Sequence, residues 1–302
     1  MIGPLLRSPR RGPRTSPYPL GAARRTKNLL TDLVEYCLAP FARWEKMRLV
    51  TERVEVTLAG LDPAFDGYRI AFLTDMHTSP IVPRWWLDRA VQSALDLKPD
   101  LIALGGDFLD DDPHYIAALG DILRPLRAPD GVFGVLGNHD HYVGPEGVRE
   151  ELAEAGVREL FNTSVTLERG GGKLALAGVG DLERDTIDFD QALAGVSESV
   201  PRIVLSHDPD VMAFWPPHLR LDLMLSGHTH GGQAWLPIIG PPFVPSQFGF
   251  RYLQGLMREG DRQLYVSRGV GCSGAPIRWR CPPELTDLVL RSDRMARPPS
   301  SI

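Results

Sequence analysis

Five of the eight histidines follow short apolar segments, in small clusters that also hold Asp, Asn and Gly. The clusters are Asp75-Met76-His77, Gly106-Asp107-Phe108-Leu109-Asp110, Gly137-Asn138-His139-Asp140, Ser206-His207-Asp208 and Gly227-His228-Thr229-His230. A lone histidine at a strand end is most often structural, but five such positions beside turn-forming glycines indicate one shared site. Imidazole nitrogens and carboxylate oxygens without thiolates suit Mn, Fe, Co, Ni or Zn better than Ca or Mg.

The number of candidate ligands exceeds what one metal ion needs. The seven are Asp75, His77, Asp107, Asn138, His207, His228 and His230. Two ions roughly 3.5–4 Å apart that share one carboxylate would use the whole set. A hydroxide that bridges two such ions is a nucleophile at neutral pH, so the set predicts metal-dependent hydrolysis.

The apolar segments before these clusters alternate with helical patterns, which is typical of an α/β protein. Strands are expected at 54–58, 68–73, 101–104, 131–136, 202–205 and 221–225, and helices at 83–97, 114–123 and 146–155. Because sites in α/β sheets form beyond the carboxyl ends of strands, the clusters should meet there. A hairpin over 164–178 and later strands at 263–267 and 285–290 predict two stacked mixed sheets flanked by helices.

The five clusters, in this order over residues 70–233, resemble the sequence blocks of the calcineurin-like metallophosphoesterases. Gly67-Tyr68-Arg69-Ile70, Gly231-Gly232-Gln233 and Ser267-Arg268-Gly269-Val270-Gly271 are similar to the YaeI/YkuE-type phosphodiesterase branch. The resemblance implies a four-layer αββα sandwich and a dinuclear phosphoesterase, with a diester favoured over a monoester as substrate.

The resemblance also implies a role for each residue that matches the family's motifs. Asp75, His77 and His230 would hold the first metal ion. Asn138, His207 and His228 would hold the second, and Asp107 would bridge both. His139 would act on the phosphate as a general acid or charge stabiliser, and Asp140 would orient His139 or tune its basicity.

Composition and charge divide the chain into segments. The net charge is −5, which argues against general nucleic-acid binding, and three cysteines cannot form a disulfide framework. Residues 1–28 hold seven basic and no acidic residues, with five prolines, and are expected to be a disordered arm. An amphipathic helix is expected at 29–48, the phosphoesterase domain at 50–293 and a disordered tail at 294–302.

Two features leave the location and the substrate open. The helix at 29–48 either packs on the domain or, with the basic arm, holds the protein to an anionic membrane. The apolar segments 81–86 and 234–245 either pack against the sheets or grip a lipid tail. The second interpretation favours a lipid-linked substrate, such as a phospholipid or a UDP-sugar lipid A precursor. A cytoplasmic or peripherally membrane-associated location in a bacterium is expected, and export stays open.

Two other functions compete with catalysis on this fold. One is a catalytically silent, metal-binding scaffold, but such a relative would have lost His139 or a ligand. The other is a redox-active or structural metal protein, in which His139 and Asp140 would have no evident task. Asp110 is expected to orient a neighbouring loop or ligand, Asp111 to be solvent-exposed and Arg278 to lie on a solvated face.

Overall fold

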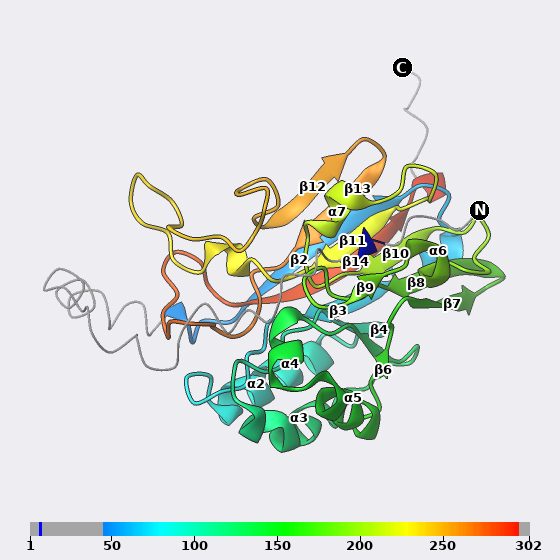
Figure 1. Ribbon diagram of the computed structural model, residues 1–302. Helices are drawn as coiled ribbons and strands as arrows, with labels where there is room; N and C mark the ends of the chain where they lie inside the picture. Colours follow the sequence, from blue (N-terminus) through cyan, green and yellow to red (C-terminus); the bar gives the residue numbers. More distant parts are fainter. Residues whose placement is uncertain (1–5, 8–44, 296–302) are drawn as a thin grey trace, which may run out of the picture.

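Two six-stranded β-sheets stacked on one another form the centre of the protein (Figure 1). The structure is a computed structural model that describes residues 6–7 and 45–295. The strand order of the first sheet is β2 (Val50–Leu58), β14 (Glu284–Ser292), β3 (Arg69–Leu73), β4 (Leu101–Leu104), β5 (Val132–Gly134) and β6 (Arg158–Glu159). That of the second is β12 (Gly255–Glu259), β13 (Arg262–Val266), β11 (Leu223–Ser226), β10 (Arg202–Leu205), β8 (Gly172–Gly178) and β7 (Thr163–Arg169).

Both sheets are mixed, as the sequence predicts. In the first sheet β14 runs parallel to β2 and antiparallel to β3, whereas β3, β4, β5 and β6 are mutually parallel. In the second sheet β8, β10, β11 and β13 are parallel, and β7 and β12 are antiparallel edge strands. The carboxyl ends of the central strands therefore lie at one edge of each sheet.

Three apolar clusters separate four layers. Helices α2 (Arg84–Asp96), α3 (Ile116–Leu123) and α5 (Pro145–Glu154) cover the outer face of the first sheet through one cluster. A second cluster fills the space between the sheets. The third lies under the short helices α6 (Phe189–Ala192) and α7 (Val211–Phe214) on the second sheet. The αββα prediction is confirmed.

The central strands are continuous apolar runs because both of their faces are covered. In β3, Ile70 and Phe72 belong to the cluster between the sheets, while Ala71 and Leu73 face the helical layer. Strand β4 alternates in the same way. Parallel strands that are covered on both sides need such runs, and they hold the turns that follow them on a rigid frame.

Shorter elements complete the chain. They are β1 (Leu6–Arg7), paired with β9 (Thr186–Ile187), helix α4 (Asn138–Val143), and the 3-10 turns η1 (Pro63–Phe65), η2 (Pro113–Tyr115), η3 (His230–Gly232) and η4 (Asp293–Met295). The basic arm apart from Leu6–Arg7, the amphipathic helix as far as residue 44 and the tail from residue 296 lie outside the described residues. Over the described part of the chain, every helix is too short or too polar to cross a membrane.

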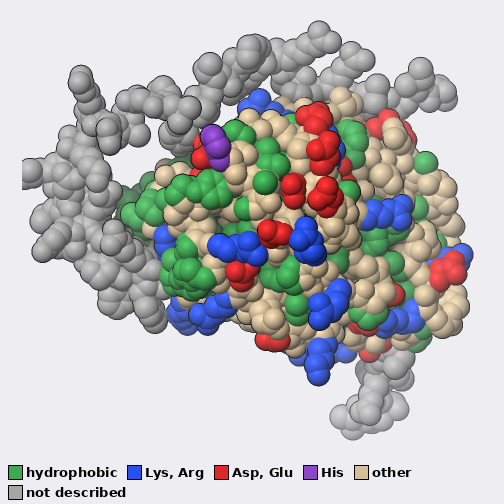
Figure 2. All heavy atoms as spheres, turned by 90° about the horizontal axis from the view of Figure 1, so that it is seen from below, with side chains coloured by type: hydrophobic (Ala, Val, Ile, Leu, Met, Phe, Trp, Pro, Cys, Tyr) green, Lys and Arg blue, Asp and Glu red, His purple; other side chains and the backbone are tan. Residues whose placement is uncertain are grey.

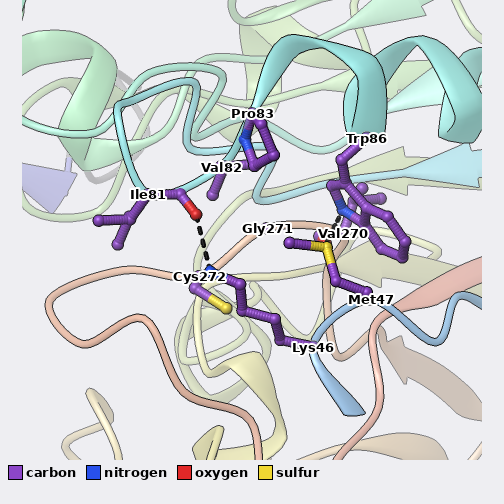
Figure 3. A pocket seen from close by; sticks show the side chains of 9 residues that line it. All are labelled: Lys46, Met47, Ile81, Val82, Pro83, Trp86, Val270, Gly271 and Cys272. Atoms are coloured by element: carbon purple, nitrogen blue, oxygen red, sulfur yellow. Dashed lines mark hydrogen bonds between the residues drawn. The ribbon is translucent and has the colours of Figure 1, made fainter. Parts of the chain in front are cut away.

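The apolar segment 81–86 is mostly packed. Val82 and Trp86 are buried, and the indole Nε1 of Trp86 donates to the Val270 carbonyl at 3.1 Å. The Lys46 ammonium donates to the Ile81 carbonyl at 2.9 Å, beside the small crevice that Figure 3 shows. Of the two alternatives for this segment, packing against the sheet is therefore correct, with Trp85 left exposed.

Candidate metal centre

The turns after five parallel strands bring the seven candidate ligands together. The first sheet supplies Asp75 and His77 after β3, Asp107 after β4, and Asn138 after β5 at the start of α4. The second sheet supplies His207 after β10, and His228 and His230 after β11. All seven are buried. The site thus lies where the two sheets meet, and neither sheet holds it alone.

The backbone at these positions is strained. Ten non-glycine residues of the described chain have a left-handed φ, and five of them are candidate ligands. These five are Asp75, His77, Asp107, His228 and His230. Such conformations cost about 1–3 kcal/mol each and persist where the surrounding structure enforces them, which is typical of functional sites.

Two glycines allow the turns to approach one another. A Cβ on Gly227 would overlap the Asp75 carboxylate and the Thr74 hydroxyl, and a Cβ on Gly137 would overlap the Asp107 carboxylate. Any side chain at either position would push apart the turns that carry the ligands.

Asp75, His77 and His230 form one group. The Nε2 atoms of His77 and His230 are 2.9 Å apart, and His230 Nε2 is 3.4 Å from Asp75 Oδ1. The other oxygen of Asp75 accepts from the Thr74 hydroxyl at 2.9 Å, and the His228 amide donates to Oδ1. These contacts fix the carboxylate and leave the three donor atoms within 4.8 Å of one another.

Asp107, His207 and His228 form the second group. Asp107 Oδ2 is 3.1 Å from His207 Nε2, and His207 Nε2 is 3.2 Å from His228 Nδ1. The other ring nitrogen of His207, Nδ1, lies 2.8 Å from the Gly105 carbonyl, which orients the ring. Asp107 Oδ2 is also 3.5 Å from His77 Nε2, so this carboxylate lies between the two groups.

Asn138 provides an independent test of whether a cation fits. Its side-chain Oδ1 is buried and has no hydrogen-bond partner among the described residues. Its Nδ2 donates to the Tyr142 hydroxyl at 3.2 Å, which sets the orientation of the amide. A buried carbonyl oxygen without a partner is costly, and a bound cation would satisfy it.

Electrostatics favour the protonation state that a metal ligand needs at Asp107, His228 and His230. At His207 they do not: burial lowers its pKa, but the Asp107 charge outweighs burial and raises that pKa well above its usual value, so His207 must release a proton to bind a metal ion. Burial raises the pKa of Asp107, but the neighbouring His207 and His139 outweigh it and hold that pKa well below its usual value. Burial lowers the pKa of His228 and His230, and the adjacent His207 and His77 lower these values further. An ionised carboxylate and neutral imidazoles are the forms that bind metal ions.

His139 lies beside the site but faces other carboxylates. Its amide donates to Asp107 Oδ1 at 2.9 Å, and its Nδ1 is 3.0 Å from Asp111 Oδ1 and 3.7 Å from Asp110 Oδ1. Burial opposes its charge, but Asp107, Asp111 and Asp110 outweigh burial and raise the pKa of His139 to about 9. The ring is therefore protonated at neutral pH in the metal-free protein.

Asp140 has a different position from the one expected. Its carboxylate accepts from the amides of Phe108, Leu109 and Gly137 at 2.9–3.1 Å, and so joins the turn after β4 to the turn after β5. Burial and the Asp107 charge raise the pKa of Asp140 to about 6. The expectation that Asp140 orients the His139 ring is thus corrected, because Asp111 contacts that ring instead.

Three further residues support the site. Asp110 Oδ1 lies 3.2 Å from His77 Nδ1, in agreement with its expected orienting role. Arg278 is fully buried rather than solvated, donates to the carbonyls of Arg268, Gly269 and Gly271, and lies 3.4 Å from His230 Nδ1. The burial of Arg278 has no signal in residue spacing. The contact of Tyr142 with Asn138 does have one, because Tyr142 follows Asn138 by one helical turn.

The fold and the site define an α/β protein of two stacked sheets with a candidate metal centre where the sheets meet. The family described as calcineurin-like phosphoesterase matches residues 68–232, and this chain belongs to that family. It is therefore a metallophosphoesterase, an enzyme that hydrolyses phosphoric esters.

Two bacterial relatives agree with this assignment. The chain is 40% identical over 230 residues to "Phosphodiesterase YaeI" of Escherichia coli, which covers 74% of this chain and 82% of that protein. It is 33% identical to the "Uncharacterized metallophosphoesterase YkuE" of Bacillus subtilis, covering 83% of this chain and 89% of that protein. Among solved structures, TT1561 of Thermus thermophilus aligns with a TM-score of 0.46 at 18% identity, over 68% of this chain and 90% of that one.

Proposed function

We propose that this protein is a phosphodiesterase that uses two metal ions. The observation that carries the proposal is the position of Asp107, whose Oδ2 is 3.5 Å from His77 of one ligand group and 3.1 Å from His207 of the other. Asp75, His77 and His230 would hold one ion and Asn138, His207 and His228 the other, with Asp107 lying between the two groups. The donor set suits Mn, Fe, Co, Ni or Zn.

The residues around this centre have separate roles in the proposed reaction. When bound, the ions supply positive charge to phosphate oxygens and lower the pKa of water. His139 donates a proton or a hydrogen bond to the leaving oxygen. Burial opposes its charge, but the Asp107 and Asp111 carboxylates raise its pKa and so favour the protonated form. Asp140 keeps the turns that carry Asp107 and Asn138 in register through three amide hydrogen bonds.

The preference for a diester rests on similarity. The relative that shares 40% identity is named a phosphodiesterase, and the alignment covers 82% of its length. We extend that activity to this chain as part of the proposal.

A lipid-linked ester, such as a phospholipid or a UDP-sugar lipid A precursor, is the substrate class that we propose. The support is the loop that follows His230, which exposes several large apolar side chains to solvent. We also propose that residues 1–48, with their seven basic residues before position 29, bring the protein to the periphery of a membrane.

The test is a hydrolysis assay on protein stripped of metal and reloaded separately with Mn, Fe, Co, Ni or Zn. A bis-aryl phosphodiester is compared with an aryl phosphomonoester, and bound metal is counted by elemental analysis. Two ions per chain and diester turnover that depends on them are expected. One ion per chain would contradict the dinuclear centre, and turnover of the monoester alone would contradict the diester preference. Two bound ions without turnover of any ester would favour the silent scaffold.

A further inference from the structure

The loop between η3 and β12, residues 233–254, leaves the metal centre and projects from one end of the molecule (Figure 1). We propose that this loop inserts its exposed apolar side chains into the surface of an anionic lipid bilayer. The apolar surface consists of Leu236, Ile238, Ile239, Phe243 and Phe250. The inference extends the proposed function. It rests on that function for one consequence only, namely that the enzyme meets its substrate at the membrane.

The exposure of these side chains is unusual for a water-soluble surface. Ile238 is fully exposed, and Ile239, Phe243 and Phe250 are 71%, 65% and 61% exposed. Single exposed apolar residues are common, but five large ones within 15 positions of one loop are more than scattered exposure accounts for and point to an interaction site.

The loop holds its outermost residues in a defined turn. Leu236 and Gly240 exchange two backbone hydrogen bonds of 2.9 Å, so Ile238 and Ile239 lie at the tip between them. Ile238 has a φ of 71°, which is rare and costly for a β-branched residue. The apolar tip is thus presented outward by a closed turn instead of being folded back on the protein.

The charge of this region fits an anionic surface. No acidic residue occurs between Asp222 and Glu259, although the chain has 38. The face covered by α2, α3 and α5 differs, because acidic and basic side chains are interspersed on it (Figure 2). An acidic residue in the loop would be repelled by anionic headgroups, and the loop has none.

The chain that precedes residue 45 joins the described structure beside the loop. The Glu45 carboxylate accepts from the Arg280 amide at 2.6 Å. The adjacent Trp279 exchanges backbone hydrogen bonds with Gln233 and Trp235 at the base of the loop. Residue 45 therefore lies beside the base of the loop, and the lack of acidic side chains in the loop favours an anionic bilayer over an apolar protein partner.

The base of the loop is tied to the metal centre. The Trp235 indole donates to the Gly231 carbonyl at 2.8 Å, one residue after His230. A bilayer bound to the loop tip would therefore lie close in the chain to the metal ligand His230. This position suits an enzyme whose substrate is anchored in the bilayer.

The experiment is co-sedimentation of the full chain with vesicles of phosphatidylcholine alone or mixed with phosphatidylglycerol. The variants are Phe243→Asp and the double variant Ile238→Asp/Ile239→Asp. The matched control is Phe161→Asp, which places the same charge at a Phe that is 39% exposed and lies outside the loop. We expect the wild type and Phe161→Asp to bind the anionic vesicles, and each loop variant to bind at least about tenfold more weakly.

The salt dependence of vesicle binding distinguishes a contact through the loop from a contact through the basic arm. Binding through exposed charges alone weakens strongly at about 0.5 M salt, whereas apolar insertion persists. Binding that salt abolishes and that the loop variants leave unchanged would assign the contact to the arm and overturn the inference. A wild type that binds no vesicle, or an equal loss in Phe161→Asp, would also overturn it.

Two further readouts distinguish a membrane surface from a dimer interface and from the chemistry at the metal centre. If the loop instead joins two copies of this chain, sedimentation will show a dimer that Phe243→Asp dissociates, with no vesicle binding. Turnover of the water-soluble diester is measured for every variant and should not change. A wild type that turns over the diester without binding vesicles refutes the membrane surface alone, and absent turnover with intact vesicle binding refutes the proposed function alone.

Discussion

Asp107 Oδ2 lies 3.1 Å from His207 Nε2, so a carboxylate at the end of the first sheet meets an imidazole at the end of the second. Both side chains are buried, and each is held from behind: His207 by the Gly105 carbonyl, and Asp107 by the His139 amide. The contact joins the two sheets at the site, so a substitution at either residue should affect the ligands that both sheets supply.

Replacing Asp107 should disable both metal positions together. We expect Asp107→Asn to lower diester turnover by more than about 100-fold, because an amide has no charge to share between two cations. Elemental analysis should find fewer than two ions per chain. Asp112→Asn is the control, since Asp112 lies in the same loop and caps η2. An Asp107→Asn protein with two ions and a normal rate would contradict the assignment.

Replacing His139 should impair chemistry while sparing metal binding. Loss of a general acid costs typically about 10²–10⁴-fold in rate, and that drop in kcat is expected for His139→Ala. The metal content should equal that of the wild type, because His139 belongs to neither proposed ligand set. His114→Ala, at an exposed position, is the control. Near-normal kcat in His139→Ala would remove this residue from the mechanism.

Asp111→Asn tests what keeps His139 protonated. The Asp111 charge raises the pKa of His139, so its removal should lower that pKa. The alkaline limb of the kcat profile should then move to lower pH, and kcat at acidic pH should be retained. A proton NMR titration of His139 provides a second measurement. The same profile in Asp112→Asn should not move, because Asp112 contacts His114 and not His139.

Tyr142→Phe should weaken metal binding more than it slows the loaded enzyme. The variant keeps the ring that lies beside His139 and removes only the hydroxyl that orients the Asn138 amide. A loss of roughly 10–100-fold in metal affinity is expected, as for other groups that orient ligands, with kcat restored at saturating metal. Tyr115→Phe on the helical face is the control. Unchanged affinity would show that Asn138 needs no such support.

The metal-free protein should lose a stabilising contribution from Asp181 as pH rises. Burial raises the pKa of Asp181 to about 7, above the 3.8 of the unfolded chain. Because the native state then binds the proton more tightly, this contribution is fully present below about pH 4 and lost by about pH 7. Relative to wild type, Asp181→Asn should gain as much as about 4 kcal/mol of unfolding free energy between these limits. Urea unfolding at several pH values measures this gain. A difference in unfolding free energy between variant and wild type that stays constant with pH would contradict it.

Residue types and spacing alone identify the α/β class and the seven candidate ligands. The reason is local: apolar runs covered on both faces must be central strands, and polar clusters that follow parallel strands must lie at their carboxyl ends. Pro and Gly positions likewise mark where strands give way to turns, so the helices and strands around the site fall close to their expected positions.

Which polar groups touch one another around the ligands depends on the tertiary structure. Asp140 is adjacent to His139 in sequence, yet it bonds to the backbone of two turns, and Asp111 from another strand end contacts the ring. Arg278 looks like a surface residue in sequence and is buried behind His230, because a late loop returns to the site.

The apolar segments 81–86 and 234–245 are both rich in large apolar residues. The first is largely packed against the helical side of the first sheet, whereas the second has no layer of the described structure over its tip. Composition is local, whereas contact and exposure depend on how distant segments pack.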